Sequence, residues 1–379
     1  MKKYDVTALG ELLIDFTENG RSAQGNPTFE ANPGGAPCNV LAMLSKLGNK
    51  TAFIGKVGDD FFGKQLRDAI IEVGIDASYL LKDEVHTTLA LVHNRPDGDR
   101  DFSFYRNPGA DMMLTEDEVP EELIKNSKIF HFGTLSMTHK GVREATKKAL
   151  EIAKNAGVMI SFDPNLRPPL WDSLETAREQ VLYGLGFCDV LKISDNEIEW
   201  LTGENDYTAG VEWIRKRYNI PLILVSMGRD GSRAYYDGGT SAQKDVTFAN
   251  LNVTSAQKDV TSANLNVTSA NLNVTSANLN VISGMEKGGN VLRSGSSKKI
   301  MVEEKAFLQK NTVDTTGAGD TFFGCILHYL CRYDISELNE TLLTEMLRFA
   351  NAAASIVTTR KGALRVMPDV SEVKRLLKA

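Results

Sequence analysis

The chain has 379 residues, 42% hydrophobic and 24% charged, which suits one large globular domain with an appendage or two domains. Its net charge of −6 argues against a nucleic-acid partner, because proteins that bind phosphate backbones carry a basic face. No stretch reaches the roughly 18 consecutive apolar residues of a membrane span, and the first residues do not resemble a signal peptide. The four cysteines form no CxxC pair, so we expect reduced thiols in a cytoplasmic protein.

Strand-like and helix-like patterns alternate along most of the chain. Short apolar runs predict strands at 6–9, 51–54, 128–132, 158–162, 190–193 and 222–225. Helical patterns between them predict helices near 39–47, 61–73, 139–156, 173–186 and 209–218, several of which end at a glycine. Continuous apolar strands separated by helices are typical of a mostly parallel sheet with helices on both faces. The sequence therefore predicts an α/β fold.

The segment from Leu89 to Tyr105 departs from this alternation. Two apolar runs, 89–93 and 101–105, flank an Asp97-Gly98 pair, which is a β-hairpin signal. Strands joined so tightly cannot both belong to a parallel crossover sheet, so we predict a small separate sheet from about 12–33 and 86–108. Such a sheet beside a large domain suggests a lid over a cleft. Its apolar hairpin would benefit from burial, which favours a homodimer through the lid.

From Thr240 to Val281 the chain repeats every seven residues. A coiled coil is disfavoured, because Thr, Ser, Asn and Val are weak helix formers and the later copies lack charged flanking positions. Asn-rich sequence of low complexity is more often disordered. We predict an insertion over about 239–298, between strands at 232–237 and 300–305, in a single domain that spans 1–379.

The run Asp314–Asp320 (DTTGAGD) carries the main chemical signal. Its small residues lead into an apolar helical pattern at 322–330, so backbone N–H groups at a helix N-terminus would be open to an anion. A carboxylate beside such a site can take a proton from a hydroxyl that attacks a phosphoryl group. Taken alone, Asp320 could equally be a first-turn acid that stabilises the helix.

A second glycine-containing run, Gly58–Gln65, nearly matches the phosphate-binding loop (P-loop) of nucleoside triphosphatases. Gln65 stands where that loop needs Ser or Thr to bind magnesium, and two acids and two phenylalanines fill the loop. We therefore predict an ordinary helix start capped by Asp59 or Asp60.

With Gly34–Val40 (GGAPCNV) and Leu47-Gly48 near its start and Asp314–Asp320 near its end, the sequence resembles the ribokinase-like, or PfkB-type, carbohydrate kinases, and within them the fructokinases. The resemblance covers nearly the whole chain except 239–298. It implies a ribokinase-like fold with a lid, and transfer of the γ-phosphoryl group of ATP to the primary hydroxyl of a small sugar. Other stretches that look like fructokinase are Gly10–Phe16, Phe104–Pro108 and Phe162–Arg167.

The resemblance also implies roles for individual residues. Asp320 matches the catalytic base, and Gly317, Ala318 and Gly319 match the anion hole. The positions that match or suggest substrate contacts are Asp15, Gly34, Gly35, Asn39, Arg106 and Arg167. The positions that match the ATP site are Asn196, Ser226, Gly228, Gly231, Gly317, Gly319 and Asn351.

Two metal sites are implied in the same way. Asn196 and Glu199 match an Asn-x-x-Glu motif that positions Mg²⁺ through water and phosphate, and Asp314 with Thr316 matches a site for a monovalent cation such as K⁺. Ordinary structural roles stay open at several positions: a helix start at Asn196, a helix cap at Asn39, a surface ion pair at either arginine.

The substrate and even the class of protein have alternatives. Fructose fits the resemblance best, and 2-keto-3-deoxygluconate is the rival, since Arg106 and Arg167 could pair with a carboxylate. A non-catalytic sugar or nucleotide sensor on a kinase scaffold is the alternative from another class. Loss of Asp320 or Asn39 would mark such a sensor, and both residues are present.

Overall fold

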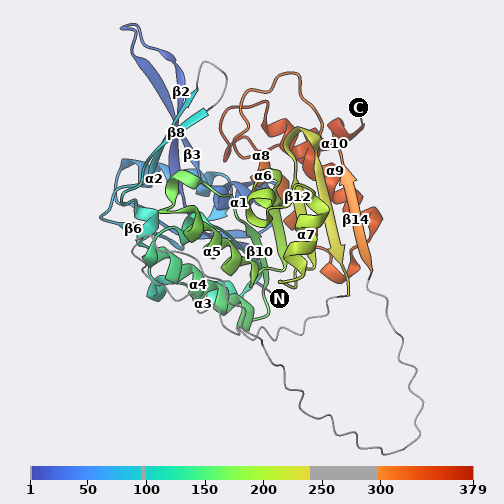
Figure 1. Ribbon diagram of the computed structural model, residues 1–379. Coiled ribbons are helices and arrows are strands. Elements are labelled where there is room, and N and C mark those ends of the chain that lie inside the picture. The colour runs from blue at the N-terminus through green and yellow to red at the C-terminus, as the bar shows by residue number, and fades with distance from the viewer. Residues whose placement is uncertain (1, 95–99, 240–297, 379) are drawn as a thin grey trace, which may run out of the picture. The chain divides into compact units, whose positions relative to one another are not determined.

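The computed structural model describes residues 2–94, 100–239 and 298–378, which belong to one compact unit (Figure 1). The Asp97-Gly98 turn and the seven-residue repeat lie outside the described residues. Among the helices described in these ranges, none combines the length and the apolar character that crossing a bilayer requires.

A sheet of ten strands forms the centre of this unit. Its spatial order is β14 (Lys299–Glu304), β13 (Ser232–Asp237), β12 (Leu222–Ser226), β11 (Val190–Ser194), β10 (Met159–Asp163), β9 (Ser127–Gly133), β1 (Tyr4–Leu9), β4 (Thr51–Gly58) and β5 (Ile75–Asp76), with β6 (Leu80–Asp83) beside β4. The strands from β12 to β5 and β6 are parallel, whereas β13 and β14 are antiparallel at one edge. The predicted mostly parallel sheet is confirmed.

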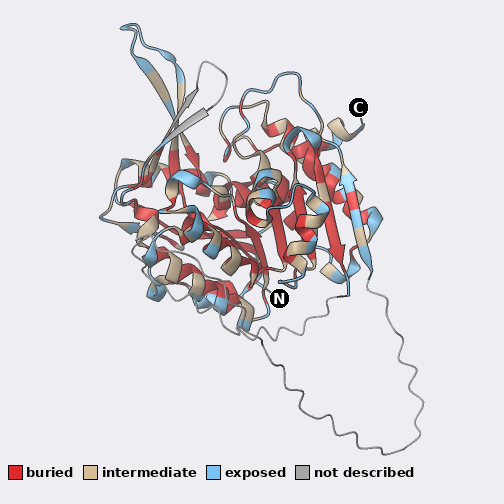
Figure 2. Cartoon of the chain, in the orientation of Figure 1, coloured by how far each residue is buried: buried red, intermediate tan, exposed pale blue. Residues whose placement is uncertain are grey.

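Helices cover both faces, because successive side chains of a strand point to opposite sides of the sheet. In β12, Leu222 and Leu224 join the core on one face, and Ile223 and Val225 join the core on the other. The first face packs against α1 (Ala36–Lys46), α2 (Phe61–Glu72), α8 (Ala318–Leu330), α9 (Glu340–Val357) and α10 (Val370–Lys378). The second packs against α3 (Glu121–Lys125), α4 (Lys140–Asn155), α5 (Leu174–Leu185), α6 (Asp195–Thr202) and α7 (Tyr207–Arg215). The central strands are buried almost throughout (Figure 2).

A second sheet of four strands has the order β3–β2–β7–β8. Its strands are β2 (Leu13–Arg21), β3 (Pro27–Gly34), β7 (Leu89–Asn94) and β8 (Arg100–Tyr105), as expected from the two segments predicted to form a separate sheet. β7 and β8 pair antiparallel, and β7 lies parallel to β2. The β2–β3 hairpin extends away from the large sheet, and its far end is exposed (Figures 1 and 2).

The near match to a phosphate-binding loop is the capped start of α2. The Asp60 carboxylate accepts hydrogen bonds from the Gly63 amide at 2.7 Å and from the Thr87 amide and hydroxyl at 2.8 and 2.7 Å. One side chain therefore begins a helix and fixes the segment that leads into β7. The helix cap predicted at Asp59 or Asp60 is confirmed at Asp60.

We expect Asp60→Ala to lower the free energy of unfolding by about 1–2 kcal/mol, because a helix cap and two contacts to Thr87 are lost together. Asp59→Ala is the matched control: its side chain is 68% exposed and pairs with Lys82 on the surface, so the loss should stay below about 0.5 kcal/mol. Urea unfolding of both variants measures the difference. Equal losses would contradict the capping role.

Candidate active site

A cavity of about 320 Å³ opens where the small sheet meets the carboxyl edge of the large sheet. Open α/β sheets bind their ligands at this edge. One wall comes from Glu11 after β1, Asn165 and Arg167 after β10, and Lys192 within β11. The small sheet supplies Leu13, Asp15, Thr17, Asn32, Pro33 and Phe104, and the segment before α8 with its first turn supplies Asp314, Thr315, Thr316, Gly317, Gly319 and Asp320.

The start of α8 presents backbone to this cavity. Gly317 is the N-cap, with a left-handed φ of 76°, and a Cβ there would lie 2.6 Å from the Cβ of Ala363. Its carbonyl accepts hydrogen bonds from the Thr321 amide and hydroxyl at 2.8 and 2.7 Å, which fixes the first turn. The amides of a first helical turn have no partners within the helix. The Ala318 amide donates to the Thr315 carbonyl at 3.3 Å. Since Gly317 and Gly319 line the cavity without side chains, the backbone at these two residues is accessible to an anion there.

Asp320 stands in the first turn of α8 and is bound by Asn39 of α1. The Asn39 amide nitrogen donates to the Asp320 carboxylate at 2.8 Å, across 281 residues of sequence. Burial raises the pKa of Asp320, and the hydrogen bond from Asn39 and the charges of Lys192 and Arg167 oppose that rise. The Asn39 carbonyl oxygen is buried and has no hydrogen-bond partner among the described residues. The two sequence motifs thus meet in a hydrogen bond between a buried carboxylate and an amide.

The Gly34-Gly35 pair brings the small sheet against the start of α1. A Cβ at Gly34 would collide with the Asp15 carboxylate, and Gly35 has a φ of 132° and faces the Glu11 carbonyl. Glu11 is buried, and its carboxylate accepts the Ala36 amide at 2.8 Å, which caps α1 in place of Gly35. Burial raises the pKa of both Glu11 and Asp15 to about 7. Because Gly34 and Gly35 have no side chains, Asp15 and Glu11 can pack closely against this segment.

The comparisons with known proteins agree with this geometry. The family model for pfkB family carbohydrate kinases matches residues 3–255 and 290–370. The chain belongs to this family. It is 37% identical to a probable fructokinase-2 of Arabidopsis thaliana, over 98% of this chain and 95% of that protein. The resemblance predicted from the two motifs is confirmed.

Two solved structures are similar over essentially the whole chain. The fructokinase of Xylella fastidiosa with bound ATP has a TM-score of 0.76 and 26% identity, covering 100% of this chain and 99% of that one. The fructokinase of Vibrio cholerae O395 in its fructose, ADP and calcium ion bound form has a TM-score of 0.74 and 25% identity, covering 100% of each chain. The arrangement of the sheets is therefore that of a pfkB family kinase.

Of the two arginines predicted to contact substrate, the structure places one in the cavity. Arg167 is exposed and lines it. Arg106 does not line it: its side chain is 2% exposed, pairs with Asp111 at 2.7 Å and donates to the Thr138 hydroxyl and the Leu135 carbonyl. Arg106 directly follows β8, and its guanidinium pairs there with the buried carboxylate of Asp111. We expected Arg106 to contact the substrate, but in this structure its guanidinium is engaged in the protein interior.

The Asn-x-x-Glu motif lies on α6. Asn196 and Glu199 are exposed on α6 and lie outside the cavity lining. The inward carboxylate is Glu197, which accepts the Ser194 amide and hydroxyl at 2.8 Å each and the Leu166 amide at 2.7 Å. Ser194 caps the helix and Glu197 occupies its third position, so a capping box fixes the phase of α6. The spacing of Ser194 and Glu197 was the sequence signal for this arrangement.

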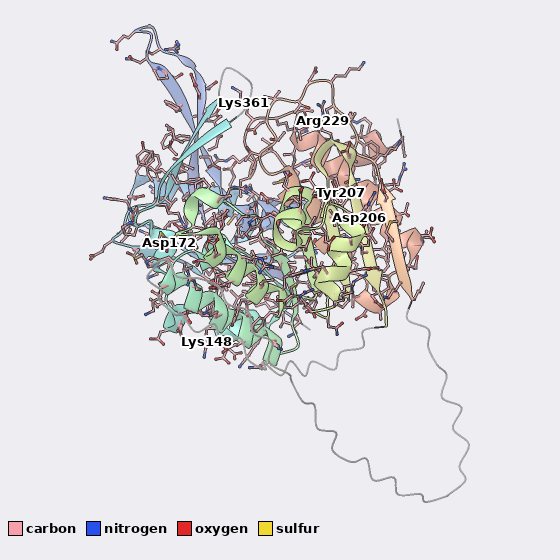
Figure 3. The ribbon with its side chains drawn as sticks, viewed as in Figure 1. Lys148, Asp172, Asp206, Tyr207, Arg229 and Lys361 are labelled. Atoms are coloured by element: carbon pink, nitrogen blue, oxygen red, sulfur yellow. The ribbon has the colours of Figure 1, made fainter. Side chains whose placement is uncertain are left out.

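The residues predicted to bind ATP after β12 lie together in one turn. Ser226 ends β12, and Gly228 and Gly231 have φ values of 52° and 105° on either side of Arg229 (Figure 3). Asn351 of α9 is buried, accepts the Ser232 hydroxyl at 2.9 Å and donates to the Glu304 and Lys305 carbonyls at 3.1 and 3.3 Å. Asn351 thus ties α9 to the antiparallel edge of the sheet, and none of these residues is in the cavity lining.

The residues predicted to hold a monovalent cation contact the loop around Gly362. The Asp314 carboxylate accepts the Thr316 amide at 2.8 Å and the Gly362 amide at 3.1 Å. Lys361, labelled in Figure 3, donates to the Asn19 side chain of β2 at 3.1 Å. The loop around Gly362 therefore contacts both the run before α8 and the small sheet.

A buried ion pair at the cavity was missed from the sequence. The Lys192 amine lies 2.9 and 3.2 Å from the two carboxylate oxygens of Asp163, and both side chains are buried. A lysine inside the apolar run Leu191–Ile193 was the available signal, because lysine is rarely buried without a partner. Asn165, with a left-handed φ of 44°, also lines the cavity and was not assigned a role.

We expect Asn39→Leu to move the acid limb of the kcat/KM profile to higher pH. The Asn39 amide stabilises the charged form of Asp320, so its loss raises the pKa, and the base is protonated sooner as the pH falls. Asn32→Leu is the matched control, because Asn32 lines the same cavity but hydrogen-bonds Thr17 and the Glu30 carbonyl. An acid limb that shifted equally in both variants would contradict the assignment.

Proposed function

We propose that this protein transfers the γ-phosphoryl group of ATP to the primary hydroxyl of fructose and forms fructose 6-phosphate. The observation that carries the proposal is the Asn39–Asp320 hydrogen bond, which sets a buried base between the sugar motif and the helix start in one cavity. The 37% identity to a plant fructokinase over nearly the full length supports fructose as the acceptor.

The chemistry follows from the arrangement of Asp320 and the start of α8. The carboxylate takes the proton of the primary hydroxyl while that oxygen forms a bond to the γ-phosphorus. The bond from the γ-phosphorus to the bridging oxygen breaks, and ADP leaves with the electron pair. The amides at Gly317, Ala318 and Gly319 stabilise the charge on the transferring group. Binding both reactants in one cavity makes the transfer effectively unimolecular.

Sugar binding is assigned to Asp15, Gly34, Gly35 and Asn39. Carboxylate and amide groups bind vicinal hydroxyls, and the two glycines leave room for the ring. The unpartnered Asn39 carbonyl oxygen suits a hydroxyl donor. Arg167 is the cation at the cavity mouth and supports substrate or phosphate binding.

The nucleotide and metal sites are assigned to residues of α6 and of the turn after β12. The Xylella relative was solved with ATP, and the Vibrio relative with ADP and calcium. We assign ATP contacts to Ser226, Gly228, Gly231 and Asn196 along the same edge of the sheet, with Asn351 supporting that edge. The exposed oxygens of Asn196 and Glu199 and the nearby Glu197 are hard donors that suit Mg²⁺ held through water and phosphate. When bound, Mg²⁺ neutralises phosphate charge.

The proposal has three further parts. Asp314 and Thr316 bind K⁺, two copies form a homodimer through the small sheet, and the protein is cytoplasmic. The neighbouring Gly362 loop gives the cation segment a second wall. The exposed outer half of the β2–β3 hairpin is the surface that a second copy would cover.

One observation bears on the rival substrate. The case for 2-keto-3-deoxygluconate needs cations that can pair with its carboxylate, and Arg106 is already paired with Asp111 in the protein interior. Of the two arginines, only Arg167 could still pair with the carboxylate of this substrate. A sensor without catalysis has no need of a base oriented by an amide beside an open helix start.

An assay of ADP release against fructose, 2-keto-3-deoxygluconate, ribose and adenosine tests the proposal. We expect fructose to give the highest kcat/KM and a product phosphorylated at the primary hydroxyl by ³¹P NMR, with little ADP release in the absence of sugar. A higher kcat/KM for 2-keto-3-deoxygluconate would replace the substrate. ATP binding without turnover of any of the four would favour the sensor.

A further inference from the structure

Lys192 is a buried cation of the large sheet whose side chain lines the cavity. It lies in β11 between two core residues, Leu191 and Ile193, and its side chain is 8% exposed. The Asp163 carboxylate at the end of β10 binds its amine at 2.9 Å. A buried ion pair is weak evidence for stabilisation, because removing both charges from water offsets much of their attraction. The pair therefore invites a functional explanation.

The amine points toward the first turn of α8. A Cβ built on Gly319 would lie 3.2 Å from the Lys192 amine nitrogen and 3.7 Å from its neighbouring carbon. A side chain at 319 would thus crowd the amine and occupy the space between it and the helix start. Lys192, Gly317, Gly319 and Asp320 all line the same cavity, so the amine and the open amides face one volume.

The charges around Lys192 are mostly negative. Burial alone would lower the pKa of Lys192, but the carboxylates of Asp163, Glu197 and Asp320 outweigh it and raise the pKa, so the amine stays charged. The described lining of the cavity contains two basic residues, Lys192 and Arg167, and only Lys192 is buried. A phosphoryl group that enters beside Asp320 meets carboxylate repulsion, which a buried ammonium can offset.

We propose that Lys192 binds the γ-phosphoryl group of the nucleotide at the start of α8, and that Asp163 holds the amine in place until the nucleotide arrives. This inference rests on the proposed kinase function. The amine donates hydrogen bonds to a non-bridging phosphoryl oxygen and keeps its own protons. The proton of the sugar hydroxyl goes to Asp320, the new oxygen–phosphorus bond forms, and ADP leaves with the electrons of the broken bond. Lys192 is then a catalytic residue, and Asp163 is a positioning residue.

The test compares Lys192→Gln with a buried lysine of similar surroundings. Lys56 of β4 is also 8% exposed and pairs with Asp83 and Glu118 at 3.1 and 2.8 Å, outside the cavity lining, so Lys56→Gln is the matched control. Calorimetry measures the affinity of each variant for ADP and for β,γ-imido-ATP, which retains a γ-phosphoryl group. Steady-state assays with ATP and fructose give kcat and KM.

We expect Lys192→Gln to lower kcat about 100-fold with little change in KM for fructose. It should weaken binding of β,γ-imido-ATP about 10-fold and leave ADP binding nearly unchanged, because one charge-assisted contact to the third phosphate is lost. Lys192→Arg keeps the charge and should retain more of kcat than the glutamine variant. Lys56→Gln should leave the ratio of the two affinities unchanged, whatever it does to stability.

Three results would overturn the inference. They are a parental kcat in Lys192→Gln, an equal loss of affinity for ADP and β,γ-imido-ATP, or the same change in that ratio in Lys56→Gln. If Lys192→Gln does not fold, Lys192→Met takes its place, because it also removes the charge and keeps a long side chain, and the same results would overturn the inference. A parent protein that turns over no sugar would contradict the proposed function, whereas the two nucleotide affinities would still decide the role of Lys192.

Discussion

The hydrogen bond from Asn39 to Asp320 is the interaction on which the site depends, and close packing of α1 on α8 makes it possible. One turn further along each helix, a Cβ at Gly324 would lie 2.9 Å from both the Met43 Cβ and the Val40 carbonyl. Gly324 thus lets the two helices approach closely enough for a short amide to reach a short carboxylate. A polar contact in the cavity is therefore set by an apolar contact in the core.

Charge balance is the second constraint on the cavity. Burial raises the pKa of Glu11, Asp15 and Asp320. In the proposed reaction, the raised pKa of Asp320 favours its acceptance of a proton. Arg167, from the segment after β10, and Lys192, from within the neighbouring parallel strand β11, supply the opposite charge. The open amides of α8 add partial positive charge without a side chain. The result is a cavity in which carboxylates and cations lie close together, as the proposed phosphoryl transfer to a hydroxyl requires.

Periodicity and turn chemistry made the fold readable from the sequence, whereas the positions of the site side chains depend on individual contacts that those patterns do not carry. The strands, the separate small sheet and the Asp60 cap follow from local patterns. Arg106 looks like any exposed arginine until Asp111 is folded against it, and the phase of α6 follows from the capping box at Ser194 rather than from the Asn-x-x-Glu pattern. Lys192 is visible only as a lysine in an apolar strand, because its partners Asp163 and Gly319 come from other parts of the chain.

The central claim is that the Asp320 carboxylate is the base for a sugar hydroxyl, and Asp320→Asn tests it most directly. The variant keeps the shape of the side chain and removes its ability to take a proton. The account predicts that turnover of fructose with ATP falls by about 100-fold or more, while calorimetry gives nearly the parental affinity for ATP. Fructose phosphorylation at close to the parental rate in Asp320→Asn would contradict it.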